Sequence, residues 1–232
     1  MSSADLEPDR NAATSEPRLD TWRWQKYAGA WCITPASGPV SSAHETNAWF
    51  VTTLAATLEA FASLARAWRI QFGTLANDDV PPVDIEWHEG EPHDTFVAKA
   101  LERIGTYPAP IYSLRVALDL CVYVRTDLSP DVPVRAWVRD LGGFALWAAA
   151  NDSEPYACFE IAHTLFRPES VNAADNAELH ALNQPLLEHS LRCWEKRLGP
   201  IRDIEGPSGI FRYGFAADDG SDEAPAERDD PR

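Results

Sequence analysis

The segment Asp84-Ile85-Glu86-Trp87-His88 is the sharpest local group of side chains that could do chemistry. On a strand, Asp84, Glu86 and His88 would project from one face, about 6–7 Å apart in succession. Two carboxylates and an imidazole are ligand types of Mn, Fe or Zn sites, and the nearby His93 could complete such a site. Ligands that follow one another along a strand lie farther apart than one metal ion prefers, so the spacing favours a solvated acidic face.

Cys158, Glu160 and His163 invite a second interpretation, a cysteine–histidine nucleophile. On a strand, Cys158 and Glu160 share a face while His163 points to the other, so the spacing favours a structural cysteine and a core histidine. The sequence contains no GxGxxG, GxxxxGK[ST], GxSxG or HExxH motif. We therefore predict no cofactor and name no catalytic residue, although many active sites have no local motif.

The strands that would position a binding surface lie in the middle of the chain. Apolar and polar residues alternate over 111–126, and a second strand is expected over 134–141. Gly142-Gly143 is expected to form a hairpin turn into 144–150, and another turn leads into 156–166. The prediction is a four-strand meander over about 111–166 with one apolar and one polar face.

The polar face of this sheet combines arginines with aromatic side chains. Its expected members are Arg115, Asp119, Tyr123, Arg125, Arg135, Trp137, Arg139 and Glu160. Aromatic residues and arginine are favoured at binding hot spots, so this face could be a partner-binding platform. An ordinary solvated face of cross-strand ion pairs is the alternative.

Long amphipathic helices are predicted on both sides of the meander in sequence. Ser42 and Glu45 form a capping box, and apolar residues follow at steps of three and four up to Phe72, before Gly73. Shorter apolar periodicity covers 94–104, and a last helix is expected over 175–198, kinked or split at Pro185. Helices packed on the apolar face of the meander give an α+β two-layer sandwich with a mainly antiparallel sheet.

Charge and composition limit the classes of partner. The chain has 36 acidic and 20 basic residues, a net charge of −16, which excludes binding to phosphate backbones and to anionic membranes. Residues 1–20 (net −3) and 218–232 (net −5) are expected to be disordered acidic tails around a single domain over 21–217. Four widely spaced cysteines without a CxxC pair, and a polar N-terminus, predict free, mostly buried thiols in a cytoplasmic protein.

Two functions fit these observations. The first is a non-catalytic acidic module that binds and neutralises a basic protein partner. In general character the chain resembles the small acidic immunity proteins with which bacteria neutralise cationic toxins, an analogy of composition and architecture. The second is an enzyme or small-molecule binder with a pocket between sheet and helices, possible metal ligands being Asp84, Glu86 and His88. The oligomeric state is left open.

Overall fold

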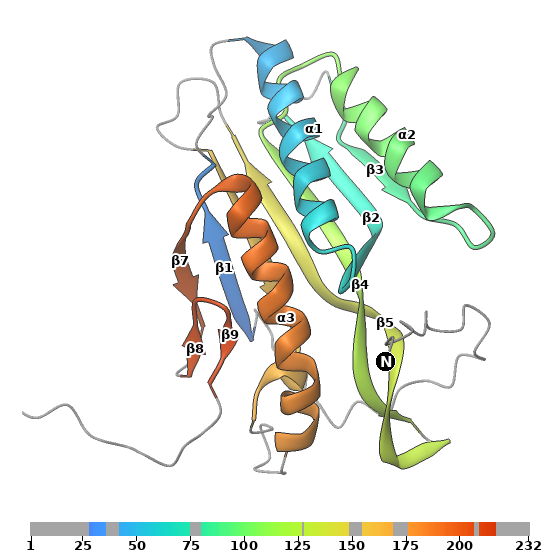
Figure 1. Cartoon of the computed structure of the whole chain (residues 1–232). Helices are drawn as coiled ribbons and strands as arrows, with labels where there is room; N and C mark the ends of the chain where they lie inside the picture. The colour runs from blue at the N-terminus through green and yellow to red at the C-terminus, as the bar shows by residue number, and fades with distance from the viewer. Residues whose placement is uncertain are drawn as a thin grey trace, which may run out of the picture.

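The computed structural model shows a sheet with helices layered on one of its two faces (Figure 1). It describes residues 28–35, 42–74, 80–126, 128–148, 155–168, 176–206 and 209–216, so the tails predicted over 1–20 and 218–232 lie outside the described residues. The helices are α1 (Ala43–Ala60), α2 (His93–Gly105) and α3 (Ala177–Leu198), with a short 3-10 helix, η1 (Thr164–Phe166). The strands are β1 (Gly29–Ile33), β2 (Ala65–Gly73), β3 (Val83–Glu86), β4 (Ser113–Thr126), β5 (Ser129–Trp147), β6 (Tyr156–Ile161), β7 (Ile201–Glu205), β8 (Ile210–Phe211) and β9 (Gly214–Phe215).

The main sheet has the strand order β3-β2-β4-β5-β6-β1-β7, and every neighbouring pair in it is antiparallel. The short strands β8 and β9 pair separately. This arrangement confirms the predicted α+β class with a mainly antiparallel sheet. None of the described helices is both long and apolar enough to cross a membrane.

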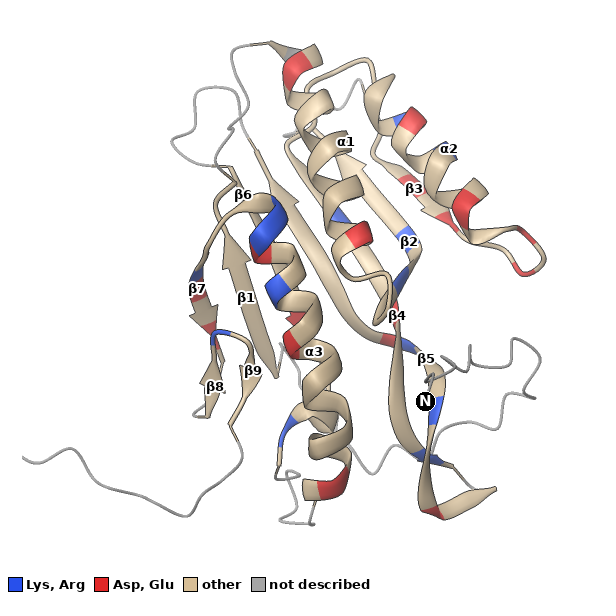
Figure 2. Cartoon of the chain, viewed as in Figure 1, with Lys and Arg blue, Asp and Glu red and all other residues tan. Residues whose placement is uncertain are grey.

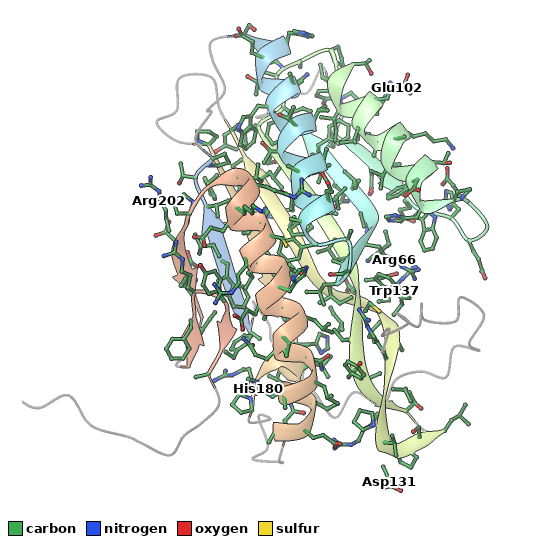
Figure 3. The ribbon with its side chains drawn as sticks, viewed as in Figure 1. Arg66, Glu102, Asp131, Trp137, His180 and Arg202 are labelled. Carbon is green, nitrogen blue, oxygen red and sulfur yellow. A yellow bond between two sulfur atoms is a disulfide. The ribbon has the colours of Figure 1, made fainter. Side chains whose placement is uncertain are left out.

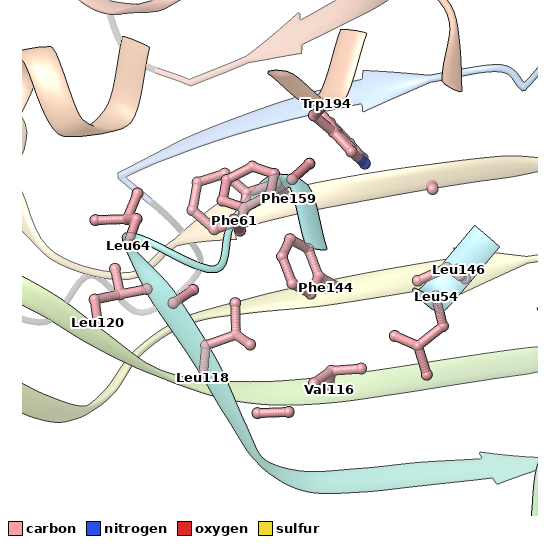
Figure 4. Packing of buried hydrophobic residues seen from close by; sticks show 14 of the residues in the cluster. Leu54, Phe61, Leu64, Val116, Leu118, Leu120, Phe144, Leu146, Phe159 and Trp194 are labelled. Carbon is pink, nitrogen blue, oxygen red and sulfur yellow. The ribbon is translucent and has the colours of Figure 1, made fainter. Parts of the chain in front are cut away.

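The core lies between the sheet and the helices. The even-numbered residues of β4 from Leu114 to Val124 are buried there, as the alternation predicted. Phe61, just after α1, contacts Phe144 of β5, Phe159 of β6 and Trp194 of α3 (Figure 4). The same elements are tied by a buried hydrogen bond in which the Trp194 indole donates to Thr57 of α1. One aromatic cluster therefore fixes two helices on the sheet.

The prediction of one helix from Ser42 to Phe72 is wrong in its second half. The capping box between Ser42 and Glu45 is confirmed, but α1 ends at Ala60 and the chain returns as β2. Apolar residues in this stretch satisfy a three-to-four spacing by coincidence. Ala65 and Ala67 are buried while Arg66 between them faces away from the core, which is strand alternation.

The predicted hairpin turn at Gly142-Gly143 is also wrong, because both glycines lie inside one continuous strand, β5. A Cβ atom on Gly142 would lie 2.7 Å from the Glu160 carbonyl oxygen, and one on Gly143 would lie 2.9 Å from the Val116 carbonyl oxygen. The neighbouring strands therefore approach too closely for a side chain. The predicted four-strand meander is consequently the three strands β4, β5 and β6.

The prediction of four free thiols is wrong for two cysteines. Cys32 of β1 and Cys158 of β6 lie directly opposite each other and form a disulfide, with a Cα–Cα distance of 4.1 Å. Cys121 and Cys193 carry free thiols. Sequence spacing gave no sign of the bond because the two strands are 126 residues apart in the chain. The helix α3 runs through Pro185 as one helix, so of the predicted kink or split the split does not occur.

Candidate binding surface

Two irregularities interrupt the sheet at one level, on either side of Asp119 in β4. In β2, Trp68 is an extra residue in the pairing with β4. In β5, the three residues Arg139–Leu141 lie opposite Asp119 alone, and Asp140 has a left-handed φ of 62°. Bulges of this kind redirect side chains. Here they turn side chains of β2 and β5 toward Asp119, on the face of the sheet opposite the helices.

Guanidinium groups and indole rings stack on each other at this level. The Arg66 guanidinium carbon lies 4.8 Å from the ring centroid of Trp87, just beyond β3, and 4.4 Å from that of Trp137 in β5. Arg139 lies 4.8 Å over the ring of Trp68. Figure 3 shows Arg66 and Trp137 together where the β4–β5 hairpin leaves the sheet. Such cation–π contacts contribute about 0.5–1 kcal/mol each at partly exposed sites.

Asp119 anchors both arginines. Its side chain is only 2% exposed; one carboxylate oxygen lies 3.2 Å from Arg66 and the other 3.3 Å from Arg139. The arginines themselves remain accessible, with side-chain exposures of 28% for Arg66 and 56% for Arg139. We call this group the arginine–tryptophan cluster. Its members are Arg66, Trp68, Trp87, Asp119, Trp137 and Arg139.

Arg135 borders the cluster and covers a buried thiol. Its guanidinium donates to the Ser63 carbonyl oxygen at 3.0 Å and lies against Cys121. Burial raises the pKa of the Cys121 thiol, while the nearby guanidiniums of Arg135 and Arg66 partly oppose that rise. The thiol is therefore held in its protonated form at neutral pH, which does not suit a nucleophile.

The position of Trp87 is fixed by its neighbours in the β3–α2 connection. Its indole nitrogen donates to the Glu91 carbonyl oxygen, and its ring meets the His93 ring edge-on. His93 in turn makes a 2.9 Å hydrogen bond to the Ala67 carbonyl oxygen of β2. These contacts hold the indole beside Arg66.

Four of the eight predicted surface residues lie at the cluster or its border: Asp119, Arg135, Trp137 and Arg139. Arg115 is on the same face but about 13 Å farther along β4. Glu160 lies opposite Gly143 in β6, also away from the cluster.

Tyr123 and Arg125 belong to a different contact, between the β4–β5 hairpin and α3. The buried Asn183 side chain accepts from the Tyr123 amide and donates to the Tyr123 carbonyl oxygen. Arg125 forms an ion pair with Glu178. These two predicted residues therefore attach a helix to the hairpin rather than extend the cluster.

Three cluster members escaped the sequence interpretation. Arg66 and Trp68 lie in the stretch up to Phe72 that the apolar spacing predicts as helix, and Trp87 lies between the candidate metal ligands Glu86 and His88. The alternation of buried and exposed positions over 65–72 is the signal that could have placed Arg66 on the polar face.

The residues proposed as metal ligands are used differently. Arg69 donates two hydrogen bonds to Asp84 and forms an ion pair with Glu86, while Gln71 also donates to Asp84. The hydrogen bonds from Arg69 are the main cause that lowers the pKa of Asp84. With His93 bonded to a backbone oxygen and His88 exposed, no three potential ligands converge within the described part of the chain.

Most of the net negative charge falls on residues that the structure does not describe. The described residues hold 17 acidic and 14 basic side chains, a net −3, so −13 of the total −16 falls on the other residues. Charges of both signs are interspersed over the helices and strands (Figure 2). Residues 21–217 carry a net −8, of which −5 falls on residues of this range that the structure does not describe.

No known protein family, no curated protein and no solved structure matches this chain.

Proposed function

We propose that this chain is a non-catalytic protein-binding module whose contact surface is the arginine–tryptophan cluster. The observation that carries the proposal is the Arg66 guanidinium, which pairs with the buried Asp119 carboxylate and lies against two indole rings, those of Trp87 and Trp137. Tryptophan and arginine dominate binding hot spots because they offer large apolar area together with directed hydrogen bonds. Rings and guanidiniums that are already fixed lose little conformational entropy when a partner docks.

The partner we propose is a protein of net positive charge, bound in the manner of an immunity protein or antitoxin. Support comes from the net charge of −16, which speeds the encounter with a cationic protein at low ionic strength. Long-range attraction and local contact are separate effects. The acidic segments would guide the partner, whereas the cluster would contact its carboxylates, carbonyl oxygens and apolar side chains.

The alternative of an enzyme or small-molecule binder with a pocket between sheet and helices has less support. Phe61, Phe144 and Phe159 occupy that interface, with ring centroids 4.5–5.4 Å apart. A metal-dependent enzyme would use the carboxylates of Asp84 and Glu86, but both form ion pairs with Arg69.

The proposal is tested by capturing partners on immobilised protein from a lysate of the source organism and measuring the affinity of the identified partner by calorimetry. Trp137→Ala is expected to weaken binding by about 30-fold or more, the size of a hot-spot loss of about 2 kcal/mol. Arg139→Ala should have a smaller effect because its side chain is more exposed.

Lys196→Ala is the matched control, since it removes one exposed cation from α3, on the other side of the molecule. Binding by this variant should equal that of the unaltered protein. Equal affinities for Trp137→Ala and Lys196→Ala would remove the cluster as the contact surface. A captured partner of net negative charge would contradict the proposed partner class alone.

A further inference from the structure

We propose that the partner segment is an extended peptide in which acidic and apolar residues alternate. This peptide adds a strand to the outer edge of β5 beside the cluster. This inference rests on the proposed function and specifies the chemistry of the ligand. It follows from the backbone of the β4–β5 hairpin and from the side chains on its two faces.

The β4–β5 hairpin extends beyond its neighbours in the sheet. On the β4 side, β2 begins at Ala65, which pairs with Leu120. On the β5 side, β6 pairs only with Gly142–Trp147. The outer edge of β5 ahead of Gly142 therefore has no neighbouring strand in the part of the chain that the structure describes.

The direction of the backbone groups on this edge follows from the partners of β4. The Cys121 amide donates to the Leu64 carbonyl oxygen and the Tyr123 amide donates to Asn183, so both point away from β5. Cys121 pairs with Trp137, and Tyr123 pairs with Arg135. In an antiparallel ladder, residues opposite such positions also point their N–H and C=O groups outward.

Arg135 and Trp137 consequently offer two amide donors and two carbonyl acceptors at the outer edge of β5. The two edges of the hairpin differ in this respect. Along β4, the Asn183 amide occupies the place of a strand by bonding both backbone groups of Tyr123. Along β5, no side chain of the described residues does the same for Arg135 or Trp137.

The free edge has a defined length. Pro133, two residues before Arg135, has no N–H to offer, which is a common protection of strand edges. At the other end, Asp140 already has an interaction of its own, and the Leu141 carbonyl oxygen accepts from the Ala162 amide. The interval between these points fits an added strand of about four to six residues.

The side chains on the two faces of the edge define the sequence that fits. Arg135, Trp137 and Arg139 alternate with Val134, Ala136 and Val138 along β5. A strand added here would place every second residue beside the arginines, which favours Asp or Glu, and the others beside the aliphatic row. Backbone bonds would supply affinity and the alternating contacts would supply specificity.

The test uses the full chain and a synthetic peptide of about eight residues in which valine and glutamate alternate, with amide hydrogen exchange followed by NMR. The peptide is expected to slow exchange at Arg135 and Trp137 by about tenfold or more at saturation. Ala136 and Val138 are internal controls, because their amides face β4 and are paired without the peptide.

Two further probes separate strand addition from charge attraction. A valine–lysine peptide should bind at least about tenfold more weakly than the valine–glutamate peptide, and so should a valine–glutamate peptide N-methylated at alternate residues, which lacks the edge donors. Binding of the glutamate peptide without slower exchange at Arg135 and Trp137 would overturn strand addition but leave the cluster as a contact surface. The inference would be overturned if the peptide did not bind, or if exchange at Arg135 and Trp137 were already slow in the free protein. The proposed function has its own test, the comparison of partner affinity between Trp137→Ala and Lys196→Ala.

Discussion

The two faces of the sheet use aromatic side chains in opposite ways. On the covered face, Phe61 contacts other rings, with centroids 4.5 Å from Phe159 and 5.7 Å from Trp194, and all three side chains are fully buried. At the arginine–tryptophan cluster, rings stack on guanidiniums and stay partly exposed. Rings that exclude water contribute mainly to stability, whereas rings held at the surface by charged groups suit binding. Stability and recognition should therefore be separable by mutation.

The largest expected effect lies on the covered face. Phe61→Ala removes the ring that joins α1, α3 and the sheet, and it should lower the free energy of unfolding by about 4 kcal/mol. Urea denaturation followed by circular dichroism measures the change. Peptide binding per folded molecule should stay unchanged, so a loss of affinity in the folded fraction would show that the two faces are not independent.

The second effect concerns the disulfide, which lies on the helix-free face of β1 and β6 but away from the cluster. Replacing both Cys32 and Cys158 by serine releases a long loop and should lower the free energy of unfolding by about 3 kcal/mol. Two thiols, those of Cys121 and Cys193, should react in the unreduced, denatured protein. Four reactive thiols in protein from native cells would instead support the predicted cytoplasmic location, since disulfides are rare there.

A smaller effect is expected at Asp119, which tests how the cluster is anchored. Asp119→Asn removes the charge that holds Arg66 and Arg139, and it should cost about 1–2 kcal/mol, because both arginines can regain water. Asp84→Asn is the matched control, an exposed carboxylate paired with Arg69, with an expected cost below about 0.5 kcal/mol. Equal costs at the two sites would mean that the burial of Asp119 carries no stabilisation.

The comparison also shows what could be predicted from the sequence. Alternation along β4 identified its buried face and placed Asp119 on the polar side, and the capping box located the start of α1. Periodicity failed over 61–72, where helical and strand spacings coincide and the tertiary structure decides. A Gly-Gly pair is typical of a turn, but Gly142 and Gly143 are glycines because carbonyl oxygens of the neighbouring strands leave no room for a Cβ atom.

The cluster itself was only half predictable, for a physical reason. Trp137 and Arg139 lie on one strand, so alternation assigned them to the same face. Their partners Arg66, Trp68 and Trp87 come from β2 and the segment after β3, and they arrive through strand order and bulges. Neither feature leaves a periodic signal in a single sequence. The disulfide was missed for the same reason, because it depends on β1 pairing with β6.

The smallest expected effect is a pH dependence confined to the covered side. His180 of α3 is buried, and burial lowers its pKa below the usual value. Its Nδ1 lies 2.8 Å from the Phe166 carbonyl oxygen, which suits a neutral ring that donates from Nδ1. Because the unfolded chain binds a proton near pH 6.5 and the folded chain resists it, the stability is complete above that pH and falls as the pH drops toward the folded-state pKa.

One such proton contributes a slope of at most about 1.4 kcal/mol per pH unit. The free energy of unfolding, measured at pH 7.5 and pH 5, should contain this pH-dependent contribution in the unaltered protein. The contribution should be absent in His180→Asn, whose amide can still donate to the Phe166 carbonyl oxygen. His189→Asn, an exposed position on the same helix, should leave it in place. Peptide binding at the cluster depends on arginines that stay charged throughout this range, so its affinity per folded molecule should change less than the stability. The contrary result would be weaker peptide binding at pH 5 together with an unchanged loss of stability at pH 5 in His180→Asn. The pH response would then belong to the helix-free face, and the two faces would not divide stability from recognition.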